Sequence, residues 1–596
     1  MISYKRFAIK YVLVVLLFYV IVSGDAEVRC IESEREALLS FKNGLIDKRG
    51  ILSSWESNEC CKWHGVECSN TTGHIITLDL GFFLDQLRGK IGSSLLELHH
   101  LNYIDFSWID FGGIPIPEFI GSMKQLQHLY LSCSNFTGIV PPQLGNLTNL
   151  RSLDLSGNSL SCTSLSCFGF ASGSLEILIL SYNQLNGSIP DDLRSFSSLT
   201  HLNLKRNNFT GSIPLSISQL SKLQVLDLSL NSFEGLVPVS IGQLSKLQIL
   251  YLSHNYLEGL VSESHFSKLD NLKTLDLSFN PSLIMDIDSD WIPPFQLETI
   301  SLGRCNVGPY FPKWIRTQRN LSVLDLLGAN ITDEAPRWLW SSSSLLAKLY
   351  LSDNQISGTV PNLSSTSILY MDISFNKFSG PIPLFPANAS VIQFSGNMIS
   401  GSISSICETL HDHLKTLDLS DNRLVGEIPN CWEKIPNLYS LNLANNSFSG
   451  KIPGSFGNLQ KFAALQMHGN NLYGELPYSL RHCQRLGFLD VGGNKLTGKI
   501  PTWIGRLHKM QFLNLRGNKL HGSIPPEICN LTNIQVMDLS INNLSSIIPD
   551  CFNNFTVLAT KNATHIDPFL FGSVYLFTKN GNKHYGYSSF QWKGQE

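Results

Sequence analysis

Leucines recur along this chain in one fixed spacing, L-x-x-L-x-L-x-x-N. A clean copy consists of Leu150, Leu153, Leu155 and Asn158. The pattern returns about every 24 or 25 residues, which is the mark of a repeat architecture. The asparagine of the other copies is Asn183, Asn207, Asn231, Asn255, Asn280, Asn354, Asn376, Asn397, Asn422, Asn446, Asn470, Asn494, Asn518 or Asn542.

Five further copies keep the apolar spacing but carry another residue at the asparagine position. These residues are Phe83, Ile109, Ser134, Cys305 and Ala329. We therefore expect about 20 coils between residues 75 and 555. A chain of 596 residues is too long for a single core, which agrees with a repeat array.

The alternation of apolar and polar residues in x-x-L-x-L-x predicts a short strand with its leucines directed inward. Stacked coil on coil, such strands form one long parallel sheet. The asparagine amide is expected to bond backbone groups where the chain leaves the strand, because buried backbone groups need partners.

After the asparagine, many copies carry a second signature, G-x-I-P. Glycine permits the tight turn, the aliphatic residue packs inward, and proline ends local pairing on the outer side. Clear examples are residues 187–190, 211–214, 426–429, 450–453, 498–501 and 522–525.

The two signatures together resemble the ectodomains of plant leucine-rich-repeat receptors. Three further stretches resemble the receptor-like proteins of that class, which sense pathogen molecules or developmental peptides. They are residues 290–297, then Gly308-Pro309 with Phe311, Pro312 and Trp314, then Asp333, Pro336, Trp338 and Trp340. The likeness covers essentially all of the chain. It implies an α/β fold, a right-handed leucine-rich-repeat solenoid with a disulfide-bonded N-terminal cap.

Residues 1–24 have the features of a secretory signal peptide. Lys5, Arg6 and Lys10 precede an apolar run over residues 11–22, and small residues follow. That run is too short to cross a membrane, which takes about 20 residues. We expect entry into the secretory pathway. The resemblance places the full-length family at the extracellular face of the plasma membrane, and a complete chain of this length would be secreted.

Residues 25–74 are predicted to form the cap that covers the first coil. Ser33 and Glu36 form a capping-box pattern, and an amphipathic helix is expected with its apolar face at Ala37, Leu38, Phe41 and Leu45. Cys30, Cys60, Cys61 and Cys68 surround this helix. The resemblance implies the pairs Cys30–Cys60 and Cys61–Cys68.

The cysteines allow two further interpretations, a zinc site in the cap and disulfides between later coils. With His64 nearby, the cap cysteines could form a zinc site, although an exported chain favours disulfides. Cys407 with Cys431, and Cys529 with Cys551, are candidate bridges between neighbouring coils.

Asn-x-Ser/Thr sequons are dense, as expected for a glycoprotein. The fourteen asparagines are Asn70, Asn135, Asn146, Asn186, Asn208, Asn320, Asn330, Asn362, Asn388, Asn445, Asn530, Asn543, Asn554 and Asn562.

The repeat stops near Phe555, and residues 556–596 resemble the non-repeat island of the receptor ectodomains. In that family further repeats and one transmembrane helix would follow. We therefore expect a truncated or soluble form whose island is poorly ordered.

Partner binding is predicted on the concave face of the sheet. The outward positions lie six, four and two residues before the asparagine, together with the residue just before it, and they vary within a constant frame. The candidates are His201, Asn203, Lys205, Arg206, Tyr251, His254, Arg304, Lys348, Tyr350, Asp353, Tyr370, Asp372, Phe375, Asp421 and Tyr439.

Enzyme chemistry is not expected. No catalytic, metal or nucleotide signature stands out, so no cofactor is predicted. Asp79 and Asp105 fall on consecutive coils at the spacing of a glycosidase pair, but aspartate at that position is also repeat consensus. A net charge of −3 offers no field for nucleic acid.

The leading hypothesis is a receptor-type ectodomain that binds a peptide or protein ligand. By resemblance it would signal in plant defence or development through partner receptor kinases, either a coreceptor or an adaptor kinase. The alternatives are a soluble decoy and a secreted inhibitor of microbial wall-degrading enzymes, which would resemble the polygalacturonase-inhibiting proteins.

Overall fold

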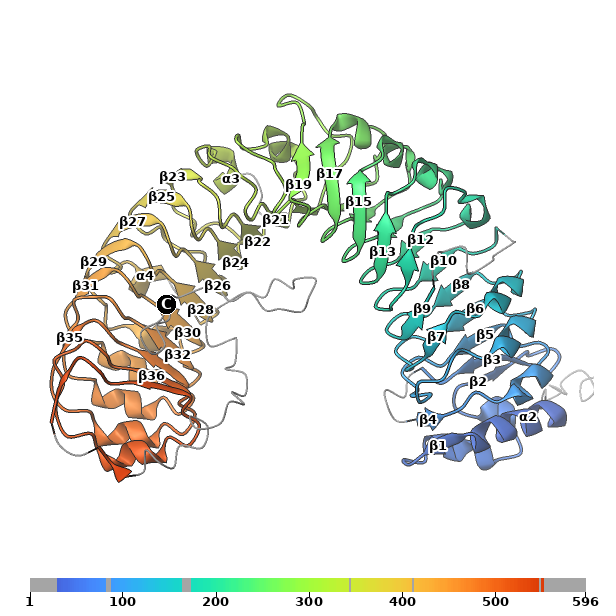
Figure 1. Cartoon of the computed structure of the whole chain (residues 1–596), viewed down its shortest axis with the longest axis horizontal. Helices are drawn as coiled ribbons and strands as arrows, with labels where there is room; N and C mark the ends of the chain where they lie inside the picture. The colour runs from blue at the N-terminus through green and yellow to red at the C-terminus, as the bar shows by residue number, and fades with distance from the viewer. Residues whose placement is uncertain are drawn as a thin grey trace, which may run out of the picture. The chain divides into compact units, whose positions relative to one another are not determined.

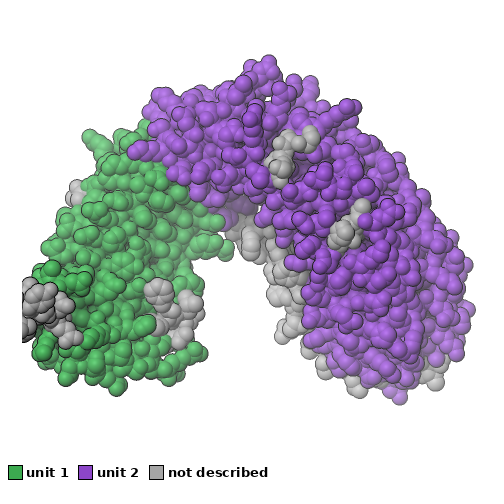
Figure 2. Space-filling view, turned by 180° about the vertical axis from the view of Figure 1, so that it is seen from behind, with its two compact units in different colours: residues 1–228 green, residues 229–596 purple. Residues whose placement is uncertain are grey.

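The computed structural model describes residues 29–81, 87–162, 173–341, 345–409, 412–545 and 548–550. The predicted signal peptide and the predicted island lie outside these residues. The chain forms two compact units, residues 1–228 and 229–596, which Figure 2 shows in separate colours. Within each unit, short strands stack side by side on one side and short 3-10 turns lie on the other (Figure 1).

The main sheet of unit 1 is parallel apart from its first strand. Strand β2 (Val66–Cys68) pairs antiparallel with β3, and every later neighbour is parallel. The parallel strands are β3 (Ile75–Asp79), β5 (Tyr103–Asp105), β6 (His128–Tyr130), β8 (Ser152–Asp154), β10 (Ile177–Ile179), β12 (His201–Asn203) and β14 (Val225–Asp227).

Unit 2 continues the same pattern with parallel strands in unbroken order. They are β16 (Ile249–Tyr251), β18 (Thr274–Asp276), β20 (Thr299–Ser301), β21 (Val323–Asp325), β22 (Lys348–Tyr350), β24 (Tyr370–Asp372), β26 (Val391–Gln393), β28 (Thr416–Asp418), β30 (Ser440–Asn442), β32 (Ala464–Gln466), β34 (Phe488–Asp490), β36 (Phe512–Asn514) and β38 (Val536–Asp538).

Shorter parallel strands follow the asparagine in many coils and form small side sheets. Unit 1 has β7 (Thr137–Ile139) with β9 (Ser159–Ser161), and β11 (Asn186–Gly187) with β13 (Asn208–Gly211). Unit 2 has β15 (Ser232–Leu236), β17 (Tyr256–Val261) and β19 (Ser282–Met285); β23 (Ser357–Thr359), β25 (Lys377–Gly380), β27 (Met398–Gly401), β29 (Arg423–Glu427) and β31 (Ser447–Ser449); β33 (Tyr473–Gly474) with β35 (Lys495–Leu496); and β37 (His521–Gly522) with β39 (Asn543–Leu544).

The outer side of the coils consists mainly of 3-10 turns. They are η3 (Ser93–Glu97), η4 (Glu118–Ser122), η5 (Pro142–Asn146), η7 (Arg194–Phe196), η8 (Leu215–Gln219), η9 (Val239–Gln243), η10 (Glu263–His265), η11 (Lys313–Thr317), η12 (Trp432–Lys434), η13 (Gly454–Asn458), η14 (Tyr478–His482), η15 (Thr502–Arg506) and η16 (Pro526–Asn530), with short helices α3 (Arg337–Ser341) and α4 (Ile406–Thr409). The signature proline stands directly before several of these turns, for example Pro214 before η8 and Pro453 before η13.

The leucines of the repeat form the core, as their alternation predicts. In β10, β12 and β14 the central Leu178, Leu202 and Leu226 are at most 2% exposed, whereas most of their strand neighbours are partly exposed. Complete burial of one such side chain is worth about 2 kcal/mol, so the stack is held mainly by its apolar interior.

The repeated asparagine joins successive coils through its side-chain amide. Nδ2 of Asn183 donates to the carbonyl oxygen of Leu155 in the preceding coil at 2.8 Å and to that of Leu180 in its own coil at 3.2 Å. Its Oδ1 accepts the N–H of Leu160 at 3.0 Å. The same bonds recur at Asn376, so the predicted ladder is present. Where asparagine is replaced, Cys305 still donates Sγ–H to the carbonyl of Leu277.

The N-terminal cap contains helix α2 (Glu32–Asn43), with β1 (Leu45–Asp47), η1 (Ile51–Glu56) and η2 (Cys60–Lys62) after it. Strand β1 pairs antiparallel with β4 (Leu87–Gly89). Ala37, Leu38 and Phe41 are buried as predicted, and the ring of Phe41 stacks on Phe106 at 5.2 Å.

Two details of the predicted cap helix are wrong. The helix already begins at Glu32, which places Ser33 inside its first turn, and its N-cap residue Ile31 makes no side-chain bond. Leu45 lies beyond the helix in β1, because the helix ends before Gly44.

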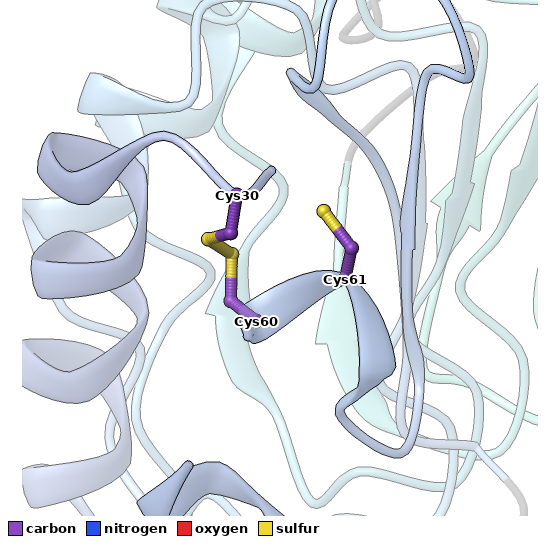
Figure 3. Close-up of side chains that lie close together, drawn as sticks. All are labelled: Cys30, Cys60 and Cys61. Atoms are coloured by element: carbon purple, nitrogen blue, oxygen red, sulfur yellow. A yellow bond between two sulfur atoms is a disulfide. The ribbon is translucent and has the colours of Figure 1, made fainter. Parts of the chain in front are cut away.

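Both cap disulfides implied by the family resemblance are formed, Cys30–Cys60 and Cys61–Cys68. Figure 3 shows the bond between Cys30 and Cys60, with Cys61 beside it. The three sulfurs lie within 4.8 Å of one another. A sulfur in a disulfide is not a thiolate, so the pairing opposes the zinc interpretation.

A third disulfide links Cys407 to Cys431 on neighbouring coils, as the spacing predicts. Cys529 is also disulfide-bonded, and its predicted partner Cys551 lies outside the described residues.

The aromatic motif over residues 290–340 is structural. Trp291 lies 6.0 Å from Phe295 and 6.2 Å from Trp314, and Phe311 lies 5.6 Å from Trp338, measured between ring centroids. The motif therefore fills the space on the outer side of its coils. Within the described residues, no helix has both the length and the apolarity needed to cross a membrane.

Asn280 offers a direct test of the asparagine ladder, because it is fully buried and bonds Leu252, Leu277 and Leu257. We expect Asn280→Ala to lower the free energy of unfolding by about 2–4 kcal/mol, since buried backbone groups lose their partners. Denaturant unfolding measures this change.

The matched control is the exposed Asn271, whose Nδ2 donates to the carbonyl of Ser245. Asn271→Ala should change the free energy of unfolding by less than about 0.5 kcal/mol. Equal losses in the two variants would refute the role assigned to the ladder.

Candidate functional site

The candidate site is the solvent-facing surface of the main sheet, described for each unit by itself. Its side chains come from the positions six, four and two residues before the asparagine and from the residue directly before it. We call this last set the left-handed column, because its backbone φ is positive. The φ of Arg206 is 53°, that of Arg304 is 58° and that of Phe375 is 52°.

In unit 1, four candidates lie together on the coil of β12. Oδ1 of Asn203 accepts the N–H of Lys205 at 3.0 Å, and the guanidinium of Arg206 lies 5.3 Å from the centre of the Tyr182 ring. Nδ1 of His201 is 2.9 Å from Oγ1 of Thr200, and burial lowers the pKa of His201. Lys205 and Arg206 thus provide a basic group, and Arg206 is exposed.

In unit 2, members of the left-handed column contact one another between coils. The ring of His254 stacks on Phe279, with centroids 4.2 Å apart and planes 8° apart. Nη2 of Arg304 pairs with Oδ2 of Asp353 at 2.5 Å, although these residues stand two coils apart. Gly328 of the coil between them makes this possible, because a Cβ there would meet Cδ of Arg304 at 3.0 Å.

Next to this pair lies a row of tyrosine and aspartate side chains. Nζ of Lys348 is 5.5 Å from the ring centre of Tyr370, and Tyr370 is paired in register with Lys348 across β22 and β24. Asp372 accepts hydrogen bonds from Oγ of Ser352 at 2.8 Å and from the N–H of Ser374 at 3.0 Å. Burial raises the pKa of Tyr350 to about 12, so its phenol stays neutral.

Three further candidates occupy the same surface. Phe375 is 49% exposed, and its ring lies over Gly396, where a Cβ would meet it at 2.5 Å. Oδ1 of Asp421 accepts a bond from Nδ2 of Asn445 at 2.8 Å. Tyr251 is half-buried on β16.

Tyr439 is a partly buried candidate that lies outside the outward set as that set is defined. It stands seven residues before Asn446, one position outside the outward set. Tyr439 packs against a cluster formed by Ala463, Ala464, Phe488 and Phe512. The rings of Phe488 and Phe512 stack with centroids 4.0 Å apart, and they are only 2% and 5% exposed.

This cluster was missed in the sequence, although a signal was present. Ala464, Phe488, Phe512 and Val536 all stand six residues before the asparagine, so four consecutive coils carry an apolar residue at one outward position. All three residues of β32 and of β34 are buried, unlike those of most other strands. The exposed part of the candidate surface in unit 2 therefore lies on the earlier coils.

Two other groups of outward side chains were also missed. In unit 1 the rings of Tyr103, His128 and Tyr130 cluster, with Tyr103 5.5 Å from Tyr130. In unit 2, Nδ1 of His468 is 3.0 Å from Oδ2 of Asp490. Burial by itself lowers the pKa of His468, but Asp490 and neighbouring aspartates raise it above its ordinary value.

Asp79 and Asp105 do lie opposite each other on β3 and β5. Burial and the neighbouring Asp105 raise the pKa of Asp79, while the N–H of Gly81 lowers it. Oδ1 of Asp105 accepts the N–H of Ser107 at 2.8 Å. Each carboxylate thus bonds its own turn, which is the structural role that repeat consensus predicts.

The twelve sequon asparagines within the described residues are all exposed. Exposure is a requirement for glycosylation, which remains a prediction at each of them. Asn554 and Asn562 lie outside the described residues, as does Phe83 of the repeat.

Asp325 on β21 gives a pH-dependent prediction. Burial raises its pKa to about 7, helped by Asp276 and Asp372, while the N–H of Leu327 lowers it. In the unfolded chain an aspartate titrates near pH 3.9. The carboxyl of Asp325 therefore stays protonated up to a higher pH in the folded chain than in the unfolded chain. Stability should therefore fall as the pH rises from about 4 through about 7.

We expect the loss to be about 1–2 kcal/mol for the partly buried side chain of Asp325, and Asp325→Asn should remove it. Urea midpoints measured at about pH 5 and about pH 7.5 provide the comparison. The exposed Asp412→Asn serves as control and should keep the pH dependence of the parent. An unchanged pH slope in Asp325→Asn would contradict the assignment.

Family comparisons agree with the repeat architecture. The sequence matches the leucine rich repeat N-terminal domain over residues 31–69. It matches leucine rich repeat families over residues 117–160, 174–196, 198–220, 211–257, 246–269, 412–472, 485–507, 509–531 and 533–555.

Similar curated proteins are plant receptor-like proteins. Receptor-like protein EIX2 of Solanum lycopersicum is 36% identical over 621 residues, covering 69% of this chain and 61% of that protein. Receptor-like protein EIX1 of the same species is 35% identical over 582 residues, covering 61% of this chain and 56% of that protein. The chain thus spans about three fifths of the length of these relatives.

Similar solved structures are ectodomains of plant receptor kinases. The ectodomain of GASSHO1/SCHENGEN3 from Arabidopsis thaliana, in complex with CASPARIAN STRIP INTEGRITY FACTOR 2, has a TM-score of 0.74 at 30% identity and covers 85% of this chain and 64% of that one. The Arabidopsis HAESA ectodomain, in complex with an IDA peptide hormone, has a TM-score of 0.65 at 28% identity. This match covers 87% of this chain and 91% of that one. HAESA has also been solved with IDA and the co-receptor SERK1. The chain is therefore a leucine-rich-repeat protein, homologous to the plant receptor-like proteins.

Proposed function

We propose that this chain is the extracellular part of a receptor-like protein that binds a peptide, free or as part of a protein, on the sheet surface of unit 2 between β18 and β28. The proposal includes signalling in plant defence or development through a partner receptor kinase. Support comes from homology to receptor-like proteins and from solved relatives that hold peptide ligands.

The observation that carries the proposal is the choice of residues in the left-handed column. Six coils satisfy the positive φ with glycine, at Gly157, Gly328, Gly396, Gly469, Gly493 and Gly517. Thirteen other described coils hold a non-glycine residue in the same conformation, among them Arg304, Asp353 and Phe375. A non-glycine residue there costs about 1 kcal/mol. Since glycine fits the coil, these exposed side chains are best explained by a use outside the fold.

The chemistry of this surface suits a peptide with mixed character. Phe375, Tyr350 and Tyr370 offer aromatic contact area, and tyrosine is a frequent energetic anchor of interfaces. Arg304 and Asp353 are paired but 47% and 39% exposed, so either can exchange its partner for a ligand group. Asp372 adds an acceptor beside them.

Signalling through a kinase partner rests on the relatives. HAESA binds a co-receptor together with its hormone, and the present chain spans only part of its receptor-like relatives. The exposed sequons and the cap disulfides suit an extracellular chain.

Phe375→Gly separates binding from folding. Relief of the left-handed conformation should offset the added chain entropy of glycine, so the free energy of unfolding changes by less than about 1 kcal/mol. Affinity should fall at least about tenfold, because an exposed aromatic contact is lost. The probe is a synthetic peptide selected on the purified chain from a displayed random library, and calorimetric titration measures its affinity.

The matched control is Ile541→Gly, since Ile541 has a φ of 53° and is 66% exposed, but lies in the coil of β38. It should leave peptide affinity unchanged. If Phe375→Gly and Arg304→Ala both bind every selected peptide as tightly as the parent chain, the proposed surface is wrong.

A further inference from the structure

A cavity of 330 Å³ lies in unit 1, beside the main sheet and next to the cap. Its floor is a regular grid from three successive coils. His74, His100 and Gln125 stand nine residues before the asparagine position of their coils, and Ile76, Asn102 and Gln127 stand seven before it. Backbone bonds between the coils fix this grid, for example from the N–H of Asn102 to the carbonyl of Ile76 at 3.0 Å.

The cap closes one end of the grid and so turns a surface into a cavity. The turn between β2 and β3 is held by bonds from the N–H of Ser69 to the carbonyl of His74 at 2.8 Å and from the N–H of Gly73 to that of Ser69 at 2.9 Å. Ser69 and Thr72 of this turn line the cavity. Later coils of unit 1 have no cap beside them, which explains the position of the cavity.

The lining is polar and has no Lys, Arg, Asp or Glu. Among the described residues, the side-chain amides of Asn102, Gln125 and Gln127 have no hydrogen-bonding partner. Each amide offers two N–H donors and a carbonyl acceptor. A phosphate or a carboxylate would lack a cationic partner here, and a metal ion would lack a carboxylate.

His74 is held in a defined orientation from behind. Its Nδ1 is 2.8 Å from Oε1 of Glu34, whose other oxygen accepts the N–H of Ile75 at 2.7 Å. Glu34 is only 3% exposed. This contact occupies Nδ1, so Nε2 is the ring nitrogen of His74 that is left to contact a ligand. The ring of His100 lies against that of His74, with centroids 3.8 Å apart and the two planes tilted by 31°.

From this lining we infer that the cavity binds a neutral sugar residue. Unpartnered amides, two hydroxyls and an oriented imidazole match a ligand whose surface is covered with hydroxyl groups. The volume is at the low end for ligand pockets, which suits one or two sugar rings.

Two sources could supply such a sugar. One is the N-glycan predicted at Asn70, which is exposed and lies between the lining residues Ser69 and Thr72. The other is a free oligosaccharide. The first source rests on glycosylation of this sequon, whereas neither rests on the proposed peptide surface of unit 2.

The test uses the full secreted chain and its Asn70→Gln variant, with N,N′-diacetylchitobiose and xylobiose as probes. Saturation-transfer NMR should show at least one disaccharide bound to Asn70→Gln, and His100→Ala or Gln125→Ala in that background should abolish the signal. Both residues are exposed, so their replacement should leave the circular dichroism spectrum unchanged.

Comparison with the glycosylated chain distinguishes the sources. If the Asn70 glycan occupies the cavity, the glycosylated chain should bind the probe at least about tenfold more weakly than Asn70→Gln, and amide exchange in residues 69–74 should be slower with the glycan. Equal binding to both chains assigns the cavity to free sugar. Asn146→Gln, which removes an exposed sequon on η5, is the control and should match the glycosylated parent.

The inference is overturned if neither disaccharide binds Asn70→Gln at about 10 mM and removal of the glycan leaves amide exchange in residues 69–74 unchanged. Binding that persists in both His100→Ala and Gln125→Ala would likewise overturn it, because the sugar would then lie elsewhere.

Discussion

The structure depends on the way each coil satisfies the backbone of its neighbour. Within the sheet, the backbone groups bond to those of the adjacent strand. Where the chain turns away from the sheet, they bond to the side-chain amide of the asparagine. One amide serves carbonyl groups in its own and the preceding coil and accepts an N–H, as at Asn183. Such groups are costly when buried without partners, so the ladder fixes the backbone of every coil that contains it. A fixed backbone leaves only the outward side chains free to vary.

This division explains what could be predicted from the sequence. The leucine spacing determines strand positions and core residues, and the asparagine determines the turn, because both are demands of burial that each coil repeats. The sites of Cys407 and Cys431 followed from coil spacing in the same way. The capping box at Ser33 failed because the helix begins before it, at Glu32, and a four-residue pattern does not define a helix start.

The site was less predictable than the fold. Periodicity tells which side chains face outward, but not which of them meet: the pairing of Arg304 with Asp353 depends on Gly328 in the coil between them. The left-handed conformation of the column is invisible where Arg, Asp or Phe occupies it. Phe488 and Phe512 are buried and Tyr439 is partly buried despite their place at the sheet surface, because local spacing does not report what covers a side chain. The cavity beside the cap is formed by the turn between β2 and β3 together with three successive coils, so no single sequence motif predicts it.

The central claim is that a rigid ladder presents the sheet surface of unit 2 to a peptide. Photo-crosslinking tests it most directly, with a photoreactive phenylalanine analogue placed at Tyr370 on the sheet surface or at Tyr478 on the outer turn η14, which is 63% exposed. The selected peptide should crosslink through position 370 and not through position 478. Crosslinking through 478 with none through 370 would show that the partner binds the other side of the coils.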